Sequence, residues 1–288
     1  MAMQERLLSW YENNRRDLPW RRTTDPYAIL VSEIMLQQTQ VDRVVPKYEV
    51  WLRAFPDFQT LAKASRSAVL RLWSGLGYNS RAVRLHALAK LLVEQHNGKL
   101  PDTEEELRKL PGIGPYTAGA IMVFAYNEPG KCVDVNVERI MKRIFFSKAN
   151  FNITKKEVEE RFLSSFPPSR ATDWGNCLMD FGSAVCTAMS PLCTKCPVYA
   201  DCKSKGECAD EKPLREKKRQ SPFIGSNRWW RGQILKALTA DSGVDEQALF
   251  SRISSVNRNY DEVKFRAALA QLKREGLVAG KVRLEIRG

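Results

Sequence analysis

Four of the seven cysteines lie between residues 186 and 202, with the spacing C-x6-C-x2-C-x5-C. These are Cys186, Cys193, Cys196 and Cys202. Four thiolates in one loop can surround a single metal centre, and zinc and a [4Fe–4S] cluster both accept an all-sulfur ligand set. A zinc ribbon usually has two C-x2-C pairs separated by a longer span, whereas this segment has one. The spacing therefore favours an iron–sulfur cluster, around which the neighbouring chain has to fold.

The charge of the chain points to a polyanionic partner. Its 46 Lys and Arg residues exceed its 33 Asp and Glu residues, which gives a formal net charge of +13 over 288 residues. Nucleic acid is such a partner, although a soluble protein can be this basic without binding one. There is no apolar run of membrane-spanning length, and the charged, aromatic N-terminal segment has no signal-peptide core. We expect a cytoplasmic, nucleoid-associated monomer.

Apolar residues recur at helical spacing from residue 1 to about residue 205, which predicts an almost entirely helical chain. The clearest amphipathic segments are residues 27–36, 42–55, 66–76, 81–96 and 117–126. Glycines and prolines fall between them, where helices should end. We found no useful β-alternation and no internal repeat in this part. The fold class is therefore all-α.

The C-terminal part of the chain has a different organisation. Residues 209–225 are charged, contain prolines and have few large apolar residues, which is typical of a linker. Residues 226–288 contain three helical patterns followed by a short strand pair, as in a winged helix-turn-helix. The third helical pattern carries Lys264, Arg266, Lys273 and Arg274, which suits a helix that meets DNA. A small protein-docking domain is the alternative.

A glycine-containing hairpin is predicted between two helical segments, from Leu110 to Thr117. Gly112 and Gly114 allow a tight turn and a close approach of the backbone to a neighbour. The amide groups at the start of the next helix would then face outward and could bind a phosphate without reading base sequence. A plain helix–helix turn is the alternative. In a basic chain with a cysteine loop, the hairpin favours a DNA contact.

Two carboxylates are candidates for acid–base chemistry. Glu33 lies among apolar residues of a helical segment, where burial would raise its pKa and suit it to act as a general acid. A solvent-facing Glu33 is the alternative. Asp134 precedes a long amphipathic helix, a position that predicts an N-cap, and that role is compatible with catalysis. Composition alone does not bring the two carboxylates together.

The motifs together resemble the helix-hairpin-helix (HhH-GPD) DNA glycosylase superfamily, and within it the MutY-type adenine glycosylases with a four-cysteine iron–sulfur loop. The resemblance covers residues 1 to about 205. The matching segments are RRDLPWR, DPYAILVSEIMLQQTQV, LWSGLGYNSRAVRLH, LPGIGPYTAGAI, VDVNVERI, LMDFGSAVC and the cysteine loop. The resemblance implies a [4Fe–4S] cluster, double-stranded DNA with a mispaired or damaged base as partner, and an enzyme of base excision repair.

Roles follow residue by residue from the resemblance. Glu33 would protonate the departing base, and Asp134 would stabilise the oxocarbenium-like sugar, in the manner of two-carboxylate glycoside hydrolysis. Tyr116 stands where lyase-type relatives such as endonuclease III carry a nucleophilic lysine, so no lysine-based strand nicking is expected. Asn136 would orient the region of Asp134. The resemblance also implies that Gln38 and Tyr78 insert as a wedge into the DNA stack. It implies that the wall of the base pocket is formed by Arg16, Leu18, Trp20 and Val41.

Three departures from the MutY pattern leave the identity of the excised base open. Asn79 replaces a second tyrosine, and Asn176 stands where Gln or Glu reads the flipped base. The domain that senses 8-oxoguanine is replaced by residues 226–288. We favour adenine opposite guanine or 8-oxoguanine. Thymine or uracil opposite guanine, or a modified base, is the alternative, and a non-enzymatic iron–sulfur DNA-binding regulator is a third hypothesis.

The resemblance also implies a domain organisation. Residues 26–130 would form a helical barrel domain with the hairpin, inserted into an iron–sulfur domain built from residues 1–25 and 131–208. The cleft between the two would hold Glu33 and Asp134.

Overall fold

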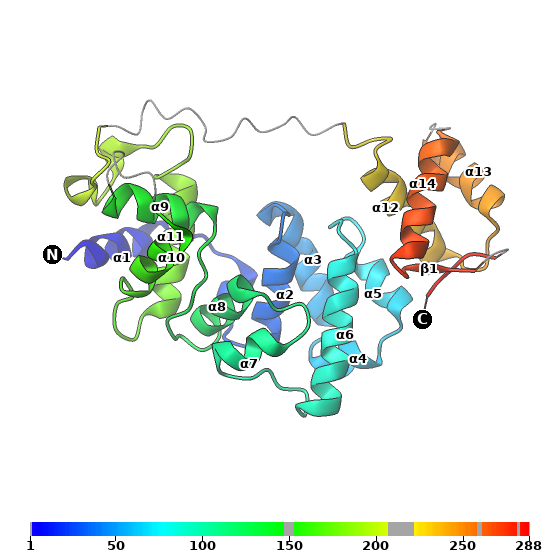
Figure 1. Cartoon of the computed structure of the whole chain (residues 1–288), viewed down its shortest axis with the longest axis horizontal. Coiled ribbons are helices and arrows are strands. Elements are labelled where there is room, and N and C mark those ends of the chain that lie inside the picture. The colour runs from blue at the N-terminus through cyan, green and yellow to red at the C-terminus, as the bar shows by residue number, and fades with distance from the viewer. Residues whose placement is uncertain (1, 147–152, 207–221, 258–260, 281–282, 288) are drawn as a thin grey trace. The chain divides into compact units, whose positions relative to one another are not determined.

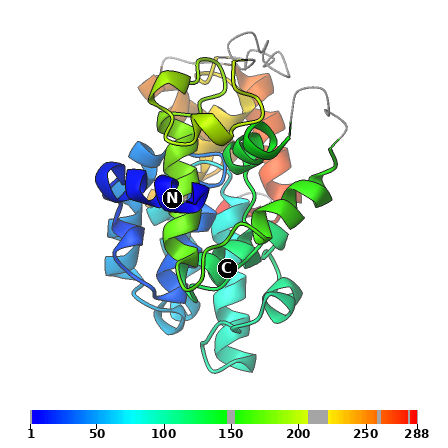
Figure 2. The same ribbon diagram turned by 90° about the vertical axis from the view of Figure 1, so that its left-hand side faces the viewer.

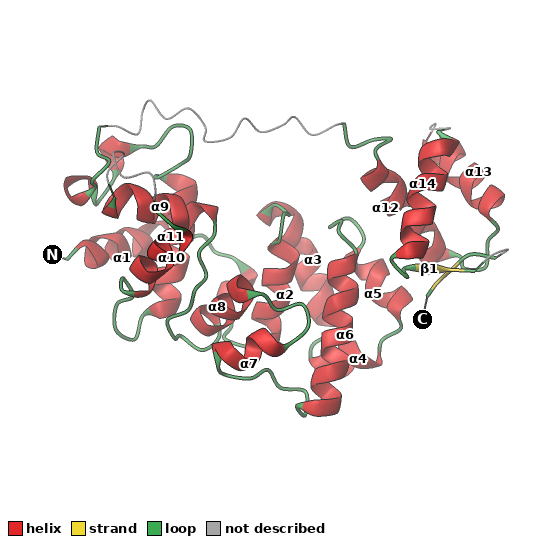
Figure 3. Cartoon of the chain, viewed as in Figure 1, coloured by secondary structure: helices red, strands yellow, loops and turns green. Residues whose placement is uncertain are grey.

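The computed structural model describes residues 2–146, 153–206, 222–257, 261–280 and 283–287. Helices dominate, and strands occur only near the C-terminus of the described chain (Figure 3). The all-α fold class is therefore confirmed. No helix in the described ranges has both the length and the apolar character needed to cross a membrane.

The chain divides into two compact units, Met1–Glu33 with Leu100–Lys217 and Ile34–Lys99 with Lys218–Gly288. The first unit contains α1 (Met3–Asn14), the short 3-10 turn η1 (Pro19–Arg21) and the start of α2 (Pro26–Leu36). It continues with α7 (Glu104–Lys109), α8 (Pro115–Phe124), α9 (Val135–Phe145), α10 (Lys155–Leu163) and α11 (Ala171–Ala184). The 3-10 turns η3 (Cys193–Lys195) and η4 (Tyr199–Asp201) follow α11.

The core of the first unit forms around α11, which packs against α1, α8 and α9 (Figures 1 and 2). Its buried side chains include Trp174, Leu178 and Phe181 from α11, with Leu7 and Ile140 from the neighbouring helices. Cys132 and Cys177 are fully buried in this core, as expected for packing residues. Burial of these apolar side chains supplies the main free energy that holds the helices together.

The second unit contains α3 (Val41–Ala54), α4 (Phe58–Lys63), α5 (Arg66–Trp73) and α6 (Ser80–Gln95). Helices α4 and α6 pack side by side, and the rings of Trp51 and Trp73 meet edge to face at 5.5 Å. Side chains that cap helix N-termini explain where several helices begin. Asp57 accepts the amide of Thr60 and Ser65 accepts that of Ala68, which satisfies donors that have no partner inside the helix.

The C-terminal segment forms α12 (Asn227–Ala240), α13 (Glu246–Asn257), α14 (Glu262–Arg274), and the short antiparallel strands β1 (Val278–Ala279) and β2 (Glu285–Ile286). Three helices followed by a strand pair is the element order expected from the sequence. The rings of Trp230, Phe250 and Phe265 form an aromatic core between the three helices. The winged-helix assignment itself stays a prediction.

The division into units differs from the boundaries expected at residues 26 and 130. Residues 100–130 group with the cysteine loop because α8 packs against α11, and the Thr172 hydroxyl donates to the Val123 carbonyl at 2.6 Å. The C-terminal helices group with residues 34–99 because α12 packs against α5, and Arg66 Nη1 donates to the Gly276 carbonyl at 3.2 Å. Within the expected linker, 209–225, residues 209–221 lie outside the described residues.

Candidate active site and cysteine pocket

Glu33 occupies a buried position on α2, where its side chain is only 8% exposed. Burial is the largest influence on its carboxyl and, together with the negative charge of Asp134, raises the pKa of Glu33 to about 7. A hydrogen bond donated by the Tyr116 hydroxyl opposes this shift, because it stabilises the ionised form. A carboxyl with this pKa carries its proton in a large fraction of molecules at neutral pH, as a general acid requires.

Tyr116 and Cys132 surround Glu33 in the first unit. Tyr116 is half-buried in the first turn of α8, and burial, followed by the charge of Glu33, raises its pKa well above the ordinary range. Burial likewise raises the pKa of the Cys132 thiol, with a further contribution from Glu33. Both side chains therefore stay neutral, and the ionisable group that changes state near neutral pH is Glu33.

Asp134 is the N-cap of α9, as the sequence predicted. Its Oδ1 accepts the amides of Asn136 and Val137 at 2.9 and 2.7 Å. Its Oδ2 accepts the side-chain amide of Asn136 at 2.9 Å. Asn136 thus orients Asp134 directly, and the charge of Asp134 reaches Glu33 within the same unit.

Arg139 links the surroundings of Asp134 to the cysteine loop. Its Nη2 donates to Asn136 Oδ1 at 3.0 Å and to the Gly182 carbonyl at 2.7 Å, while its Nε donates to the Cys186 carbonyl at 2.9 Å. Gly182 allows α11 to lie this close, because a Cβ at that position would meet the Asn136 Cβ at 2.8 Å. A continuous set of hydrogen bonds therefore runs from Asp134 to Cys186.

Asp180 is a buried carboxylate for which the sequence motifs predicted no role. It lies on α11, is 2% exposed, and accepts hydrogen bonds from Arg16 and from both Nη atoms of Arg21. Burial alone would raise the pKa of Asp180, but the hydrogen bonds and charges of Arg21 and Arg16 outweigh it and hold that pKa below its usual range. These contacts anchor the loop before η1 to α11.

The expected base-pocket residues fall in both units. Leu18 and Trp20, which are 8% and 7% exposed, lie on the loop that Asp180 anchors, and Asn176 is buried on α11. The guanidinium of Arg16 is committed to Asp180, with its side chain still 41% exposed. These four belong to the first unit, whereas Val41 is the first residue of α3 in the second unit.

The predicted hairpin joins α7 and α8 in the first unit. Gly112 has a φ of +87°, a backbone conformation that favours glycine. Gly114 is the N-cap of α8 with an extended backbone, and a Cβ placed on it would meet no atom within 4 Å. The protein's own packing therefore does not require glycine at position 114.

Gln38 and Tyr78 lie on two loops of the second unit. Both have positive φ values, 56° and 46°, although neither is glycine. Gln38 is exposed, and the Tyr78 side chain is 48% exposed. Non-glycine residues in this conformation are uncommon and are found preferentially at functional sites.

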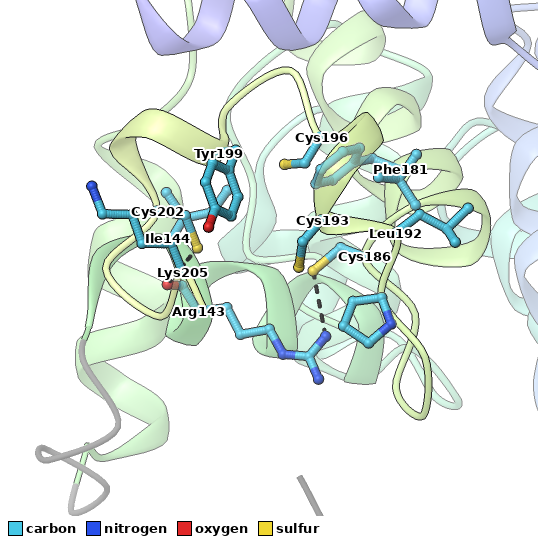
Figure 4. Close-up of a pocket in the computed structure, with 12 residues that line it drawn as sticks. Arg143, Ile144, Phe181, Cys186, Leu192, Cys193, Cys196, Tyr199, Cys202 and Lys205 are labelled. Carbon is cyan, nitrogen blue, oxygen red and sulfur yellow. Dashed lines mark hydrogen bonds between the residues drawn. The ribbon is translucent and has the colours of Figure 1, made fainter. Parts of the chain in front are cut away.

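The four cysteines of the loop line one pocket, together with Arg143, Ile144 and Phe181 (Figure 4). Cys186 follows α11, Cys193 is the first residue of η3, Cys196 follows η3, and Cys202 follows η4. In Figure 4 the sulfur atoms of Cys186 and Cys193 lie next to each other, and the loop brings Cys196 and Cys202 to the same pocket. Within the described ranges, no group of three or more His, Cys, Asp or Glu side chains is arranged to hold a single metal ion.

The chemistry of the pocket suits a thiolate-bound centre. Arg143 Nη1 lies 3.5 Å from the Cys186 sulfur, and the Cys202 thiol bonds to the Arg143 carbonyl at 3.2 Å. Burial raises the pKa of Cys196 to about 11 and also raises that of Cys202. Both thiols keep their protons at neutral pH unless a metal displaces them. A four-sulfur donor set with a cation beside it fits an anionic iron–sulfur cluster.

Comparison with known proteins places these features in a family. Residues 31–168 match the model described as HhH-GPD superfamily base excision DNA repair protein. Adenine DNA glycosylase of Mycobacterium tuberculosis (strain ATCC 25618 / H37Rv) is 38% identical over 238 residues, covering 81% of this chain and 77% of the relative. The chain belongs to the HhH-GPD superfamily. Human adenine DNA glycosylase is 40% identical over 224 residues, covering 74% of this chain but only 41% of that longer protein.

Two solved structures are similar to this chain in fold. A thermostable thymine-DNA glycosylase has a TM-score of 0.67 at 30% identity, over 71% of this chain and 95% of that one. An endonuclease III–DNA complex has a TM-score of 0.60 at 23% identity, over 70% of this chain and 92% of that one, which shows the shared fold. The resemblance inferred from the motifs is thus confirmed at the level of the superfamily and its MutY-type relatives.

Proposed function

We propose that this protein is a monofunctional DNA glycosylase that releases adenine paired with guanine or 8-oxoguanine. The observation that carries the proposal is the presence in one unit of a protonatable, buried Glu33 and a helix-capping Asp134. The two curated adenine DNA glycosylases described above support the choice of base.

In the proposed reaction, Glu33 gives its proton to a ring nitrogen of the flipped base as the N-glycosidic bond breaks. The base leaves with the bonding electron pair, and positive charge develops on the sugar. Asp134, held by two backbone amides and by Asn136, stabilises this charge. Water then completes the hydrolysis at the sugar carbon and leaves an abasic site.

Tyr116 supports a reaction that stops at the abasic site. Strand nicking by a lyase needs an amine that forms a Schiff base with the sugar. A phenol with a pKa raised well above its ordinary range cannot form one, and in this chain it donates a hydrogen bond to Glu33.

DNA contacts are proposed for both units. Gly112 and Gly114 would bring a phosphate to the N-terminus of α8, and Gln38 and Tyr78 would fill the gap left by the flipped base. Arg16, Leu18, Trp20, Val41 and Asn176 would form the wall of the base pocket. We also propose that the protein acts as a monomer in the cytoplasm, associated with the nucleoid, on the basis of its sequence.

Cys186, Cys193, Cys196 and Cys202 would hold a [4Fe–4S] cluster. Bound there, the cluster would crosslink the loop after α11 and add no chemistry to base release. Iron and sulfide analysis of the purified protein, with Cys196→Ala as the comparison, tests this assignment. We expect four irons per chain in the parent, because a [4Fe–4S] cluster contains four. We expect the Cys196→Ala variant to lose iron. A zinc-loaded parent would contradict it.

The function is tested with labelled duplexes that contain A opposite G, A opposite 8-oxoguanine, T opposite G, or U opposite G. Strand breaks are scored with and without alkali. Alkali-dependent cleavage at A is expected. Cleavage at T or U would favour the second candidate, which the 30% identity to a thymine-DNA glycosylase supports. Cleavage without alkali would contradict the monofunctional assignment.

Two variants test the residues. Glu33→Gln and Asp134→Asn should abolish base release and leave DNA affinity nearly intact, because each removes a reacting carboxyl and retains the side-chain shape. Base release at the parent rate by both variants would contradict the assignment of this site. The non-enzymatic regulator hypothesis predicts binding without base release by the parent on every duplex.

A further inference from the structure

Arg81 is a buried guanidinium between two loops of the second unit. It lies in the first turn of α6 and is 8% exposed. Its Nη1 donates to the carbonyls of Ile34 at 2.7 Å and Met35 at 3.1 Å, in the last turn of α2, and also to that of Gln37. Arg81 therefore supplies donors to carbonyls that have no partner at the helix end.

The other side of the guanidinium holds the second loop. Arg81 Nη2 donates to the carbonyls of Leu76 and Gly77 and to the Thr39 hydroxyl, each at 3.2 Å. The Arg81 guanidinium also lies 5.5 Å from the centre of the Tyr78 ring. One planar group thus binds residues 34–39 and residues 76–78 at once.

The two loops that Arg81 joins carry Gln38 and Tyr78. Each is in the left-handed backbone region, which is unfavourable for a side chain other than glycine and persists only where the surroundings impose it. Arg81 donates hydrogen bonds to Gln37, Thr39 and Gly77, which are the residues next to these two. The contacts of Arg81 are therefore placed where they can maintain both unfavourable conformations.

We infer that Arg81 is a positioning residue that fixes Gln38 and Tyr78 as a preorganised pair for insertion into the DNA stack. The inference rests on the proposed glycosylase function for the roles of Gln38 and Tyr78. Insertion of a rigid pair costs less conformational entropy than insertion of two mobile side chains. The planar guanidinium of Arg81 is essential, because a lysine at this position would keep the positive charge but could not reach six acceptors on two loops.

The experiment compares Arg81→Lys with Arg84→Lys in the full-length protein. Arg84 is exposed on the same helix, so its replacement is a matched control. The first readout is the fluorescence of 2-aminopurine placed beside the mispair, which rises when the protein unstacks the duplex. Arg81→Lys should lose most of this rise at saturating protein, whereas Arg84→Lys should retain it. An undiminished rise in Arg81→Lys would overturn the inference.

Base release provides a second readout that general destabilisation would not reproduce. On adenine opposite guanine, single-turnover base release by Arg81→Lys should be roughly 10- to 100-fold slower than by the parent, because the base would be misplaced relative to the catalytic groups. On adenine opposite an abasic site, where insertion is less demanding, the defect should shrink. Equal defects on both duplexes would assign Arg81 a purely structural role and overturn the inference.

Thr39→Val is the variant for the case in which Arg81→Lys does not fold. It removes the hydroxyl that accepts from Arg81 and bonds to the Leu76 carbonyl at 3.5 Å, while it keeps the side-chain shape. A smaller loss in the same direction is expected in both readouts, and no loss in either would overturn the inference. A parent that unstacks DNA but releases no base would instead contradict the proposed function.

Discussion

At the scale of single residues, Glu33 and Asp134 show how environment gives two carboxyl groups different tasks. Glu33 is buried, and the pKa of its carboxyl is raised to about 7, mainly by loss of hydration. Asp134 accepts two backbone amides and the side-chain amide of Asn136, contacts that hold its side chain in place at the start of α9. Glu33 can therefore donate a proton, while the carboxyl group of Asp134 is held in a fixed orientation.

The first prediction concerns pH. Because Glu33 must be protonated, kcat/KM for base release should decline above about pH 7, tenfold for each further pH unit. Tyr116→Phe removes a hydrogen bond that lowers the pKa of Glu33, so the decline should begin at a higher pH in that variant. Single-turnover rates across the pH range measure both effects. A decline that begins at the same pH in parent and variant would show that Tyr116 does not influence Glu33.

At the scale of secondary-structure elements, α11 organises the first unit through polar groups as well as through its apolar core. Asp180 binds the loop that carries Leu18 and Trp20, and the Gly182 carbonyl accepts Arg139 from α9. Both contacts join α11 to segments distant in sequence. The orientation of the loop that carries Leu18 and Trp20 and of the α9 N-terminus therefore depends on one helix.

Loss of the Asp180 ion pair should be costly. Asp180→Asn leaves Arg21, whose side chain is 10% exposed, without its anion, so unfolding free energy should fall by about 3 kcal/mol. Asp173→Asn is the control, because Asp173 pairs with Arg170 at the surface of the same helix, and it should cost less than about 1 kcal/mol. Urea unfolding at neutral pH compares them. Equal costs would mean that burial of the pair is unimportant.

The Asp180 pair also predicts a pH dependence of stability. The pKa of Asp180 is held below its usual range in the folded state. The carboxylate therefore contributes stability at neutral pH, and this contribution is lost as the pH falls through the folded-state pKa. The difference in unfolding free energy between parent and Asp180→Asn should narrow under acidic conditions. A constant difference would contradict this account.

Arg139 should couple the cysteine loop to the reaction. Arg139→Gln loses the bonds to Asn136, Gly182 and Cys186, so Asp134 loses the support of Asn136 and base release should slow by roughly 10- to 100-fold. Iron content and DNA affinity should stay near those of the parent. Lys142→Gln, which breaks a half-buried pair with Glu138 on the same helix, should leave the rate unchanged. An unaffected rate in Arg139→Gln would contradict the coupling.

At the scale of the whole molecule, the net charge of +13 predicts a strong electrostatic component in DNA binding. Ion pairs on α14 reduce the positive charge that this helix can contribute to DNA binding. Lys264 pairs with Asp261 at 2.8 Å, and Arg266 pairs with Glu262 at 2.6 Å. These basic residues suggested a DNA-contacting helix from the sequence, but carboxylates on their own helix or at its cap partly neutralise them.

The salt dependence of DNA binding distinguishes cationic side chains that pair with carboxylates from those that can contact phosphates. Lys195, an exposed residue beside the cysteine ligands, should contribute a phosphate contact, so Lys195→Ala should reduce the slope of log affinity against log salt by about one. Lys264→Ala should change the slope much less, because its charge is already compensated. Fluorescence anisotropy with an undamaged duplex over a salt series measures both slopes. A larger change in Lys264→Ala would assign α14 to the DNA interface.

Features that depend on neighbours along the chain could be predicted from the amino-acid sequence. Helical periodicity predicted the all-α class, the glycine hairpin between α7 and α8, and the N-cap at Asp134, because all three are local properties of short segments. The cysteine spacing predicted that one loop supplies all four ligands, because that spacing is also a local property of a short segment. Motif resemblance then identified the superfamily, since several long segments match in order.

Which groups far apart in sequence come into contact could be seen only in the folded chain. The contacts of Asp180 with Arg16 and Arg21, of Arg139 with Cys186, and of Arg81 with two loops all join residues far apart in sequence. A charged residue in an apolar helical segment, as at Asp180, is the one signal that could have indicated them. Burial also fixed the pKa of Glu33, because removal of water depends on the side chains that fold over the carboxyl and not on its neighbours in the chain.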